Sequence, residues 1–238
     1  YALPYEYYDK YRVRKYGFHG TSHSFVSDRA ADLEGKDKKD LKIITCHLGN
    51  GCSISAIKDG VCVDTTMGFT PLDGVLMGTR TGCVDPSAVT FVADKHGFTP
   101  AEMSDYMNKK SGFLGVSGIS SDNRDITTAA AEGNERANLV TDMLVYEIKK
   151  YIGSYAAAMN GLDAVLFTGG IGENAFDVRA AVCKDMEFFG IKLDEKANDG
   201  LRGKLQKISA ADSKVEVWVV PTNEELLIAR DTLALISK

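Results

Sequence analysis

The chain has 238 residues and a formal net charge of −5, with 28 Lys and Arg against 33 Asp and Glu. Broad binding to nucleic acid or to an anionic membrane needs a basic face, so we expect neither partner. Hydrophobic residues make up 44% of the chain and no apolar run reaches 18 residues, which is typical of a globular protein without a membrane span.

The cysteines indicate the redox environment of the protein, and the first residues indicate whether the chain is part of a longer one. The five cysteines are odd in number and include no CxxC pair, which disfavours a disulfide framework and indicates buried thiols in a reducing cytoplasm. The chain opens with "YALPYEYYDKYRVRKYG" and has no initiator Met, so we expect it to be part of a longer protein.

The first candidate motif is "GFHGTSH", from Gly17 to His23. His19 and His23 are four residues apart, but Gly20 interrupts them and HExxH is absent, so a zinc pair is disfavoured. A functional His19 that donates to a phosphoryl oxygen is the favoured interpretation. For His23 we expect a hydrogen-bonded structural histidine.

A glycine-flanked asparagine follows the first predicted strand. Leu41–Cys46 is apolar and β-branched, and predicts a buried strand. Cys52–Ile57 and Val61–Thr66 flank Asp59-Gly60, which predicts a hairpin. Between the predicted strands Leu41–Cys46 and Cys52–Ile57, "HLGNG" (47–51) either forms a tight turn or uses successive backbone N–H groups to bind a phosphate.

The segment "MGFTPLDGVLMGTRTGCVDP" (67–86) is long and glycine-rich. A loop of this length without periodicity is usually functional, and we expect it to be mobile. Arg80 lies between glycines within it, which favours a bidentate contact with phosphate or carboxylate over an exposed surface arginine.

Helices with clear start signals come next. Asp85 before Pro86 is a cap, and Thr99-Pro100-Ala101-Glu102 is a capping-box pattern. Gly97 and Gly112 suit helix ends. Apolar residues at helical spacing predict one long helix over Asn134–Asn160.

Three polar motifs remain, and each has two interpretations. "SDNRD" (121–125) is either a capped turn or a ribose or base contact. "TGGIGEN" (168–174) follows the predicted strand Ala164–Thr168, with a helix beginning near Asn174. It is either a packing turn or a set of N–H groups that bind an anion, and it is neither a Rossmann fingerprint nor a P-loop.

The last motif, "TNEE" (222–225), follows the predicted strand Val215–Val220 and precedes a final helix from Leu226. Its carboxylates either hold Mg²⁺ or stabilise the first helical turn, and taken alone the second reading is favoured. Strand–glycine loop–helix units after a hairpin predict an α/β or α+β sheet with ligands at the carboxyl ends of the strands.

Six of these motifs, in this order, resemble the acetate kinase family: "GFHGTSH", "HLGNGCSI", "MGFTPLDGVLMGTRTGCVDP", "SSDNRDI", "FTGGIGEN" and "PTNEEL". The resemblance covers essentially the whole chain. It implies the α/β fold of actin, Hsp70 and the sugar kinases, a ribonuclease H-like domain with a mixed sheet flanked by helices. Residues 1–225 resemble the C-terminal nucleotide-binding domain. Residues 226–238 resemble a closing helix that in the family packs on an N-terminal domain, which this chain lacks.

The resemblance also implies roles for individual residues. His19 and Arg80 resemble the pair that stabilises the phosphoryl-transfer transition state, Glu224 resembles the magnesium ligand, and Phe18 and Pro71 resemble part of the pocket for the acetate methyl group. The nucleotide site is implied to consist of a phosphate loop, a polar turn and an adenosine loop. These are, respectively, His47, Leu48, Gly49, Asn50 and Gly51; Asp122, Asn123 and Arg124; and Gly170, Ile171, Gly172, Glu173 and Asn174.

The implied reaction is ATP + acetate ⇌ ADP + acetyl phosphate with Mg²⁺ or Mn²⁺, in a cytoplasmic homodimer. A carboxylic acid with a pKa of about 4.3 is already ionised at neutral pH, so direct in-line transfer needs alignment and charge neutralisation rather than a general base. A propionate or butyrate kinase, a non-catalytic nucleotide-binding or dimerisation module and, more weakly, a sugar kinase are the alternatives. Because part of the family's site is absent, we expect this chain alone to be nearly inactive.

Overall fold

The computed structural model describes residues 1–237 and divides the chain into two compact units. The helical unit consists of Tyr1–Phe18, Asn50–Cys52 and Thr66–Glu147, and the sheet unit of His19–Gly49, Ser53–Thr65 and Ile148–Lys238. Lys238, the last residue of the predicted closing helix, lies outside the described residues.

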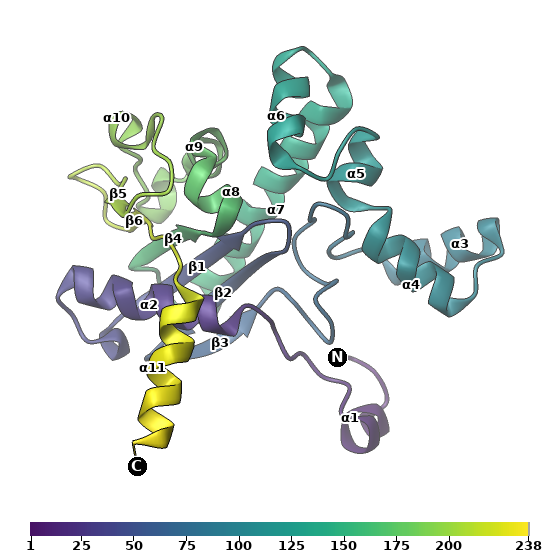
Figure 1. Ribbon diagram of the computed structural model, residues 1–238, viewed down its shortest axis with the longest axis horizontal. Coiled ribbons are helices and arrows are strands. Elements are labelled where there is room, and N and C mark those ends of the chain that lie inside the picture. Colours follow the sequence, from purple (N-terminus) through teal and green to yellow (C-terminus); the bar gives the residue numbers. More distant parts are fainter. Residues whose placement is uncertain (238) are drawn as a thin grey trace. The chain divides into compact units, whose positions relative to one another are not determined.

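A six-stranded mixed sheet of order β3-β2-β1-β4-β6-β5 forms the centre of the sheet unit (Figure 1). β1 is parallel to β4, with Ile43 opposite Ala164, and β4 is parallel to β6, with Ala164 opposite Glu216. β2 and β3, and likewise β5 and β6, are antiparallel. The strands are β1 (Lys42–Leu48), β2 (Cys52–Lys58), β3 (Val61–Thr65), β4 (Ala164–Thr168), β5 (Gln206–Lys207) and β6 (Glu216–Val219).

Five of these strands confirm the predicted strands within two residues, and β5 was not predicted. β1 continues to Leu48, so His47 lies on the strand rather than after it. The hairpin turn has positive φ at Asp59 (54°) and Gly60 (78°), as the predicted turn type requires. A register shift between Ala56 and Ile57 marks a bulge in β2.

One hydrophobic core cluster of the sheet unit lies between α2 (Gly20–Glu34) and the sheet, since α2 contacts β1 and β4. Trp218 packs against this core, and its indole Nε1 donates to Glu34 Oε1 at 3.1 Å. The start of α2 directly after His19 was not predicted. The buried apolar members of the core are Val26, Ala30, Ala31, Leu41, Ile43, Ile57, Ala164, Leu166 and Val220.

Short helices follow β4. A helix, α9 (Phe176–Cys183), begins within two residues of the predicted start near Asn174, but the short helix α8 (Gly169–Asn174) before it was not predicted. Gly169 has φ +77°, and a Cβ there would lie 2.8 Å from the carbonyl oxygen of Leu48, which is why a glycine opens this helix. The chain continues through α9 and α10 (Glu195–Asn198).

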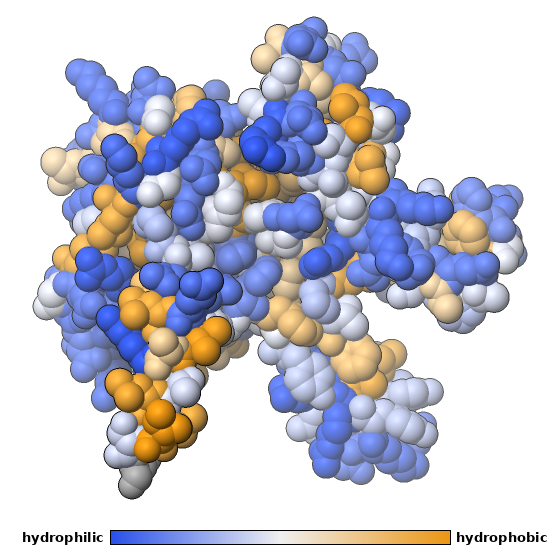
Figure 2. Space-filling view, in the orientation of Figure 1, coloured by the Kyte–Doolittle hydropathy of each residue, from blue (hydrophilic) through white to orange (hydrophobic). Residues whose placement is uncertain are grey.

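The final helix, α11 (Glu224–Ile236), contacts α2 within the sheet unit. It begins two residues before the predicted Leu226, and the predicted boundary between residues 225 and 226 therefore falls inside it. Apolar side chains gather on its exposed surface (Figure 2). They are Leu226, Ile228, Leu233, Leu235 and Ile236.

The helical unit confirms most of the predicted start signals. The Asp85 side chain accepts from Ser87 N–H, and Thr99 and Glu102 form the capping box. Gly112 was predicted to end a helix, but it is the first residue of one and has φ +60°. The helices are α1 (Tyr5–Tyr11), α3 (Pro86–His96), α4 (Pro100–Lys109), α5 (Gly112–Ser117), α6 (Asn123–Ala131) and α7 (Glu135–Met159), which continues into the sheet unit. Two 3₁₀ turns, Lys38–Asp40 and Glu187–Phe189, complete the list.

Two expectations from composition can be compared with the structure. No helix in residues 1–237 combines the length and the apolar character needed to cross a bilayer. All five cysteines lie among the described residues and none forms a disulfide. Cys46, Cys52 and Cys183 are buried, whereas Cys62 and Cys83 are exposed, so the expectation of buried thiols holds for three of the five.

Candidate active site

Three histidines gather at one place in the sheet unit. His19 is the N-cap of α2, with φ 58°, His23 lies one turn further along, and His47 lies on β1. The rings of His19 and His47 are stacked, with centroids 4.1 Å apart and planes at 20°. His23 has ring centroids 6.5 Å from His19 and 6.2 Å from His47.

Buried hydroxyl groups hold these rings. Ser53 Oγ on β2 lies 2.8 Å from His19 Nδ1 and 2.7 Å from His23 Nε2. His23 Nδ1 lies 2.6 Å from Thr45 Oγ1. On the other side, Ser22 Oγ lies 2.8 Å from His47 Nδ1. Each ring is therefore fixed on at least one side by a hydroxyl from a neighbouring element.

Two of the three histidines, His23 and His47, have lowered pKa values and are uncharged at neutral pH. Burial lowers the pKa of His23 to about 3, with smaller contributions from His47 and His19. Burial, and then the neighbouring His19, lowers the pKa of His47 to about 4. His23 is 6% exposed and within hydrogen-bond distance of a hydroxyl through both ring nitrogens, as expected of a hydrogen-bonded histidine, and its structural role stays a prediction.

Sequence reasoning missed Ser22, Thr45 and Ser53. The available signal was the period of two along β1, which puts Thr45 and His47 on one face of an otherwise apolar strand. The contacts themselves join residues 22 to 34 positions apart, which no local pattern reveals.

The predicted phosphate loop, residues 47–51, covers the last two residues of β1 and the turn that follows it. Leu48 is fully buried, so its side chain cannot reach a ligand, whereas Asn50 is exposed. In the helical unit, Gly78 N–H donates to the Asn50 carbonyl at 3.3 Å, and a Cβ at Gly78 would lie 2.1 Å from Asn50 Oδ1. This part of the turn thus lies directly against the loop that carries Arg80.

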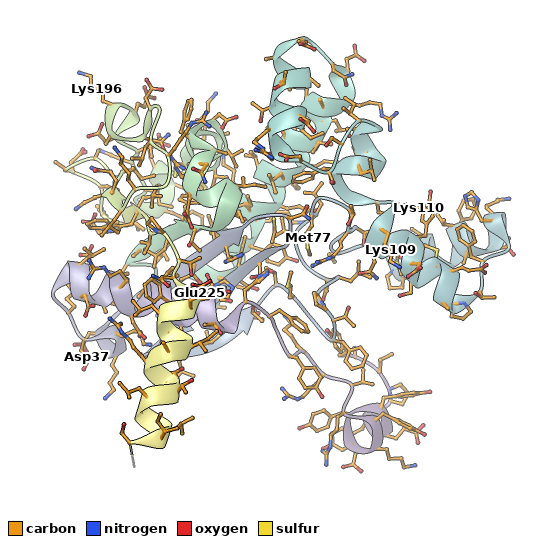
Figure 3. The ribbon with its side chains drawn as sticks, viewed as in Figure 1. Asp37, Met77, Lys109, Lys110, Lys196 and Glu225 are labelled. Atoms are coloured by element: carbon orange, nitrogen blue, oxygen red, sulfur yellow. The ribbon has the colours of Figure 1, made fainter. Side chains whose placement is uncertain are left out.

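The Arg80 loop is anchored rather than mobile, so that expectation was wrong. Met77 N–H donates to the carbonyl of Arg80 at 3.1 Å, and the carbonyl of Met77 accepts from Phe113 N–H at 2.9 Å. The Met77 side chain, labelled in Figure 3, is fully buried and fixes the loop from within. A tightly hydrogen-bonded backbone with a buried side chain keeps a loop in one conformation.

Arg80 and Pro71, two of the predicted site residues, lie together in the helical unit. The half-buried Arg80 side chain donates from Nη1 to the Pro71 carbonyl at 3.1 Å. Phe18, the other predicted pocket residue, is 36% exposed. Phe18 and Arg80 belong to the helical unit and His19 to the sheet unit.

The "SDNRD" motif contains the capped turn. Asp122 is the N-cap of α6 and accepts from Arg124 N–H at 2.9 Å. The Arg124 guanidinium also donates to the Asp122 carboxylate, from Nε at 3.0 Å and from Nη2 at 2.5 Å. These hydrogen bonds from Arg124 hold the pKa of Asp122 at about 2. Contact of Asp122, Asn123 or Arg124 with a nucleotide stays a prediction.

Within α8, the predicted adenosine loop divides into exposed and buried residues. Gly170 and Asn174 are exposed, and Asn174 Nδ2 donates to the Gly170 carbonyl at 2.9 Å. Ile171 and Gly172 are buried. The Gly169 N–H donates to Glu173 Oε1 at 3.0 Å, so this amide, one of those considered for an anion, bonds to the chain itself.

A buried arginine that the sequence did not single out braces α8. The Arg179 guanidinium is fully buried and donates to the carbonyls of Gly172 at 2.9 Å and Leu201 at 2.8 Å, and to Asn198 Oδ1 at 2.8 Å. Burial lowers the pKa of Arg179 to about 10, so it stays charged at neutral pH. The charge-assisted bond to the Gly172 carbonyl fixes the α8 backbone, and the other two tie Arg179 to residues 198 and 201.

Glu224 is the first residue of α11, and Glu225, labelled in Figure 3, follows it in the first turn. Both readings of "TNEE" are therefore compatible with the structure. Within residues 1–237 no group of three or more His, Cys, Asp or Glu side chains could hold a metal by itself. Mg²⁺, however, commonly takes only one or two carboxylates and completes its shell with phosphate and water. The Thr222 Oγ1 atom is buried without a hydrogen-bond partner in the described part of the chain, two residues from Glu224, so oxygen donors suited to Mg²⁺ are present there.

Comparison with known proteins identifies the family to which this sequence and fold belong. The model of the acetokinase family matches residues 1–230. The chain belongs to the acetokinase family. It is 59% identical over 238 residues to the acetate kinase of Bacteroides thetaiotaomicron and 58% identical over 240 residues to that of Thermotoga maritima. Each match covers the whole chain but 60% of the relative, so the chain spans about 60% of the length of these relatives.

Solved structures of acetokinase relatives confirm the predicted fold. The crystal structure of Porphyromonas gingivalis acetate kinase matches with a TM-score of 0.97 at 54% identity, covering 99% of this chain and 59% of that one. A propionate kinase from Francisella tularensis matches with a TM-score of 0.90 at 42% identity, covering 97% of this chain and 58% of that one. The mixed sheet flanked by helices is thus the α/β, actin-like kinase fold that the resemblance implied.

Proposed function

We propose that this chain forms the nucleotide-binding part of an acetate kinase, which reversibly transfers a phosphoryl group from ATP to acetate. The observation that carries the proposal is the full-length match of this chain to relatives named acetate kinase at 56–59% identity. The six motifs behind it lie at strand ends and helix starts, where α/β enzymes bind ligands.

In the proposed mechanism the acetate carboxylate attacks the terminal phosphorus of ATP in line with the departing ADP. The nucleophile is already ionised, so the protein supplies alignment and charge stabilisation. His19 donates to a phosphoryl oxygen. Because Ser53 engages Nδ1 of His19, we assign Nε2 to this contact.

Arg80 is the proposed cationic partner of the transferring group. Its guanidinium is a planar fork suited to phosphoryl and carboxylate oxygens, and the contact of Nη1 with the Pro71 carbonyl sets its direction. The anchored loop around Met77 supports this role, since a stabilising charge acts best when no reorganisation is needed.

The remaining predicted residues complete the proposed site. The turn at His47–Gly51, the Asp122–Arg124 turn and the exposed Gly170 and Asn174 of α8 contact the nucleotide. Glu224 would hold Mg²⁺ or Mn²⁺ beside the Thr222 hydroxyl. The ion, when bound, neutralises charge on the nucleotide phosphates.

Activity is tested in an intact enzyme in which this chain follows the part of the Bacteroides thetaiotaomicron relative that lies outside the match. A coupled assay should give acetate-dependent ADP release, and titration should show ADP binding. ADP binding without turnover would favour the alternative, a non-catalytic nucleotide-binding module. No ADP binding by a folded protein would contradict both.

A propionate or butyrate kinase is the second candidate, favoured by the match to the Francisella tularensis propionate kinase. The two are separated by kcat/KM for acetate, propionate and butyrate in the same enzyme. The largest value is expected for acetate, and a larger value for either longer acid would assign the second function.

We also propose a cytoplasmic homodimer, with α7 as a candidate interface and α11 packing on the part of the enzyme outside this chain. Tyr146 and Leu139 of α7 are 64% and 49% exposed, which is the kind of surface that an interface covers. Light scattering at micromolar concentration should give twice the mass of one chain. For this chain alone, a mass of 25.8 kDa would contradict dimerisation through it.

A further inference from the structure

The Ser53 hydroxyl occupies an unusual place between two histidines. Its oxygen is within hydrogen-bond distance of His19 Nδ1 and of His23 Nε2, at 2.8 and 2.7 Å. Ser53 is fully buried, so no solvent water competes for these contacts. The hydroxyl has one proton, and it can donate to only one of the two nitrogens while it accepts from the other.

Because the Ser53 hydroxyl has only one proton, the protonated nitrogen of His19 depends on the protonated nitrogen of His23. His23 is buried and neutral, so a single proton sits on either Nδ1 or Nε2. If His23 carries it on Nε2, that N–H donates to Ser53, and Ser53 donates to Nδ1 of His19. A neutral His19 then has its own proton on Nε2, the nitrogen assigned above to the phosphoryl oxygen.

We propose that Ser53 is a positioning residue that holds the ring of His19 and ties its tautomer to that of the buried His23, so that Nε2 of His19 carries the proton offered to the phosphoryl group. The ring is held from two directions, because Ser53 fixes its edge and His47 stacks on its face at 4.1 Å. Thr45 Oγ1 ends the chain of contacts at His23 Nδ1. The inference rests on the proposed function, since it acts through His19.

The test uses the intact enzyme and four variants: Ser53→Ala, His19→Ala, the double variant, and Ser55→Ala. Losing the orientation of one reacting group can cost up to about 100-fold in rate, so Ser53→Ala should lower kcat by about 10- to 100-fold, with KM for ATP and acetate within about twofold. In the His19→Ala background, Ser53→Ala should lower kcat by less than about threefold further, because residues that act as a unit are non-additive.

Ser55→Ala is the matched control. Ser55 lies two residues further along β2, is equally buried, and binds Thr65 Oγ1 at 2.9 Å instead of a histidine. It should keep kcat within about twofold of the parent enzyme. If Ser53→Ala does not fold, Ser53→Cys replaces it, because the thiol fills the same space but is a weak hydrogen-bond donor.

A spectroscopic readout tests the tautomers without turnover. In intact enzyme labelled with ¹⁵N-histidine, spectra at pH 8 should place the proton of His19 on Nε2 and that of His23 on Nε2. A proton on Nδ1 of His19 overturns the inference. In the Ser53 variant, His19 should populate both tautomers, and an unchanged His19 spectrum also counts against coupling.

The kinetic outcomes distinguish the catalytic role of His19 from the positioning role of Ser53. A wild-type kcat in His19→Ala would remove the catalytic role of His19 and with it part of the proposed function. A strongly impaired His19→Ala enzyme combined with a full additional loss from Ser53→Ala would overturn only the positioning role of Ser53.

Discussion

The histidine cluster of the sheet unit and the Asp122–Arg124 turn of the helical unit are both predicted to serve one nucleotide, yet they are held in opposite ways. His19 is fixed by Ser53, a residue 34 positions away on another strand, and by the stacked ring of His47. Arg124 is held by Asp122, two residues before it, and its side chain is 87% exposed.

The two groups therefore differ in how far they are preorganised before a ligand binds. We expect the hydrogen-bonded cluster to keep its geometry whether or not a ligand is present, as a group that acts on the transition state should. The exposed ion pair gains little from its Coulomb attraction in water, so a phosphate or ribose could exchange for Asp122 at small cost. We therefore expect the cluster and the anchored Arg80 loop to govern kcat, and the exposed residues of α6 and α8 to govern nucleotide affinity.

The largest expected effect is the inactivity of this chain alone. It spans about 60% of its relatives, so any contribution from the rest of the site is absent. Good alignment supplies about 7–11 kcal/mol of a barrier, and losing part of it should lower the specific activity by more than 1,000-fold. An acetyl-phosphate assay on this chain beside the intact enzyme checks this, with circular dichroism and ADP titration to show that the chain is folded. Comparable activities would show that the matched part is sufficient.

Arg80→Ala should come next. Removing one preorganised charged contact to the transition state typically costs about 10²–10³-fold in kcat, whereas the nucleotide Kd should change much less. Arg80→Lys should recover part of the loss, since it keeps the charge but not the fork. Steady-state kinetics and ADP titration on the three enzymes measure both quantities. Near wild-type kcat in Arg80→Ala would refute the assignment of Arg80.

His23 should contribute to stability and to its pH dependence. Its pKa is about 3 in the folded protein, below the ordinary value of 6.5, so the unfolded chain binds the proton more tightly. Stability is therefore complete above about pH 6.5 and falls as the pH drops toward 3, by roughly 2 kcal/mol at pH 5 from this group. Thermal unfolding at pH 7 and pH 5 should show a smaller drop for His23→Ala than for the parent chain. An unchanged melting temperature with lost catalysis in His23→Ala would instead give His23 a role in catalysis, either directly or through Ser53 and His19.

Much of this fold was accessible from sequence, because its signals are local. The Asp59-Gly60 turn, the Thr99–Glu102 capping box and the strand Ala164–Thr168 each depend on neighbouring residues. The short helix α8 was missed, and the close approach of Gly169 to the Leu48 carbonyl at its start involves a residue that is far away in sequence.

The candidate site shows the same limit. Single residues such as His19 and Arg80 stood out by their flanking glycines. Ser53, Thr45 and Arg179 did not, because each is defined by partners that only the folded chain brings near. The anchoring of the Arg80 loop by Phe113 likewise has no signal in the loop itself.

The smallest expected effect concerns Gly170, the exposed glycine of α8. A Cβ built there meets no atom within 4 Å, so Gly170→Val should leave the fold intact. The branched side chain would instead occupy the surface that a nucleotide approaches, and ADP affinity should fall by about tenfold, since a backbone approach that glycine allows is blocked.

The adjacent glycine provides the contrast for this test. Gly169→Ala combines φ +77° with a Cβ 2.8 Å from the Leu48 carbonyl oxygen, so it should lower the melting temperature. Titration with ADP and thermal unfolding of both variants then separate a ligand-facing position from a structural one. If Gly170→Val is folded and binds ADP as tightly as the parent chain, the adenosine site lies elsewhere, and affinity cannot be assigned to the exposed face of α8.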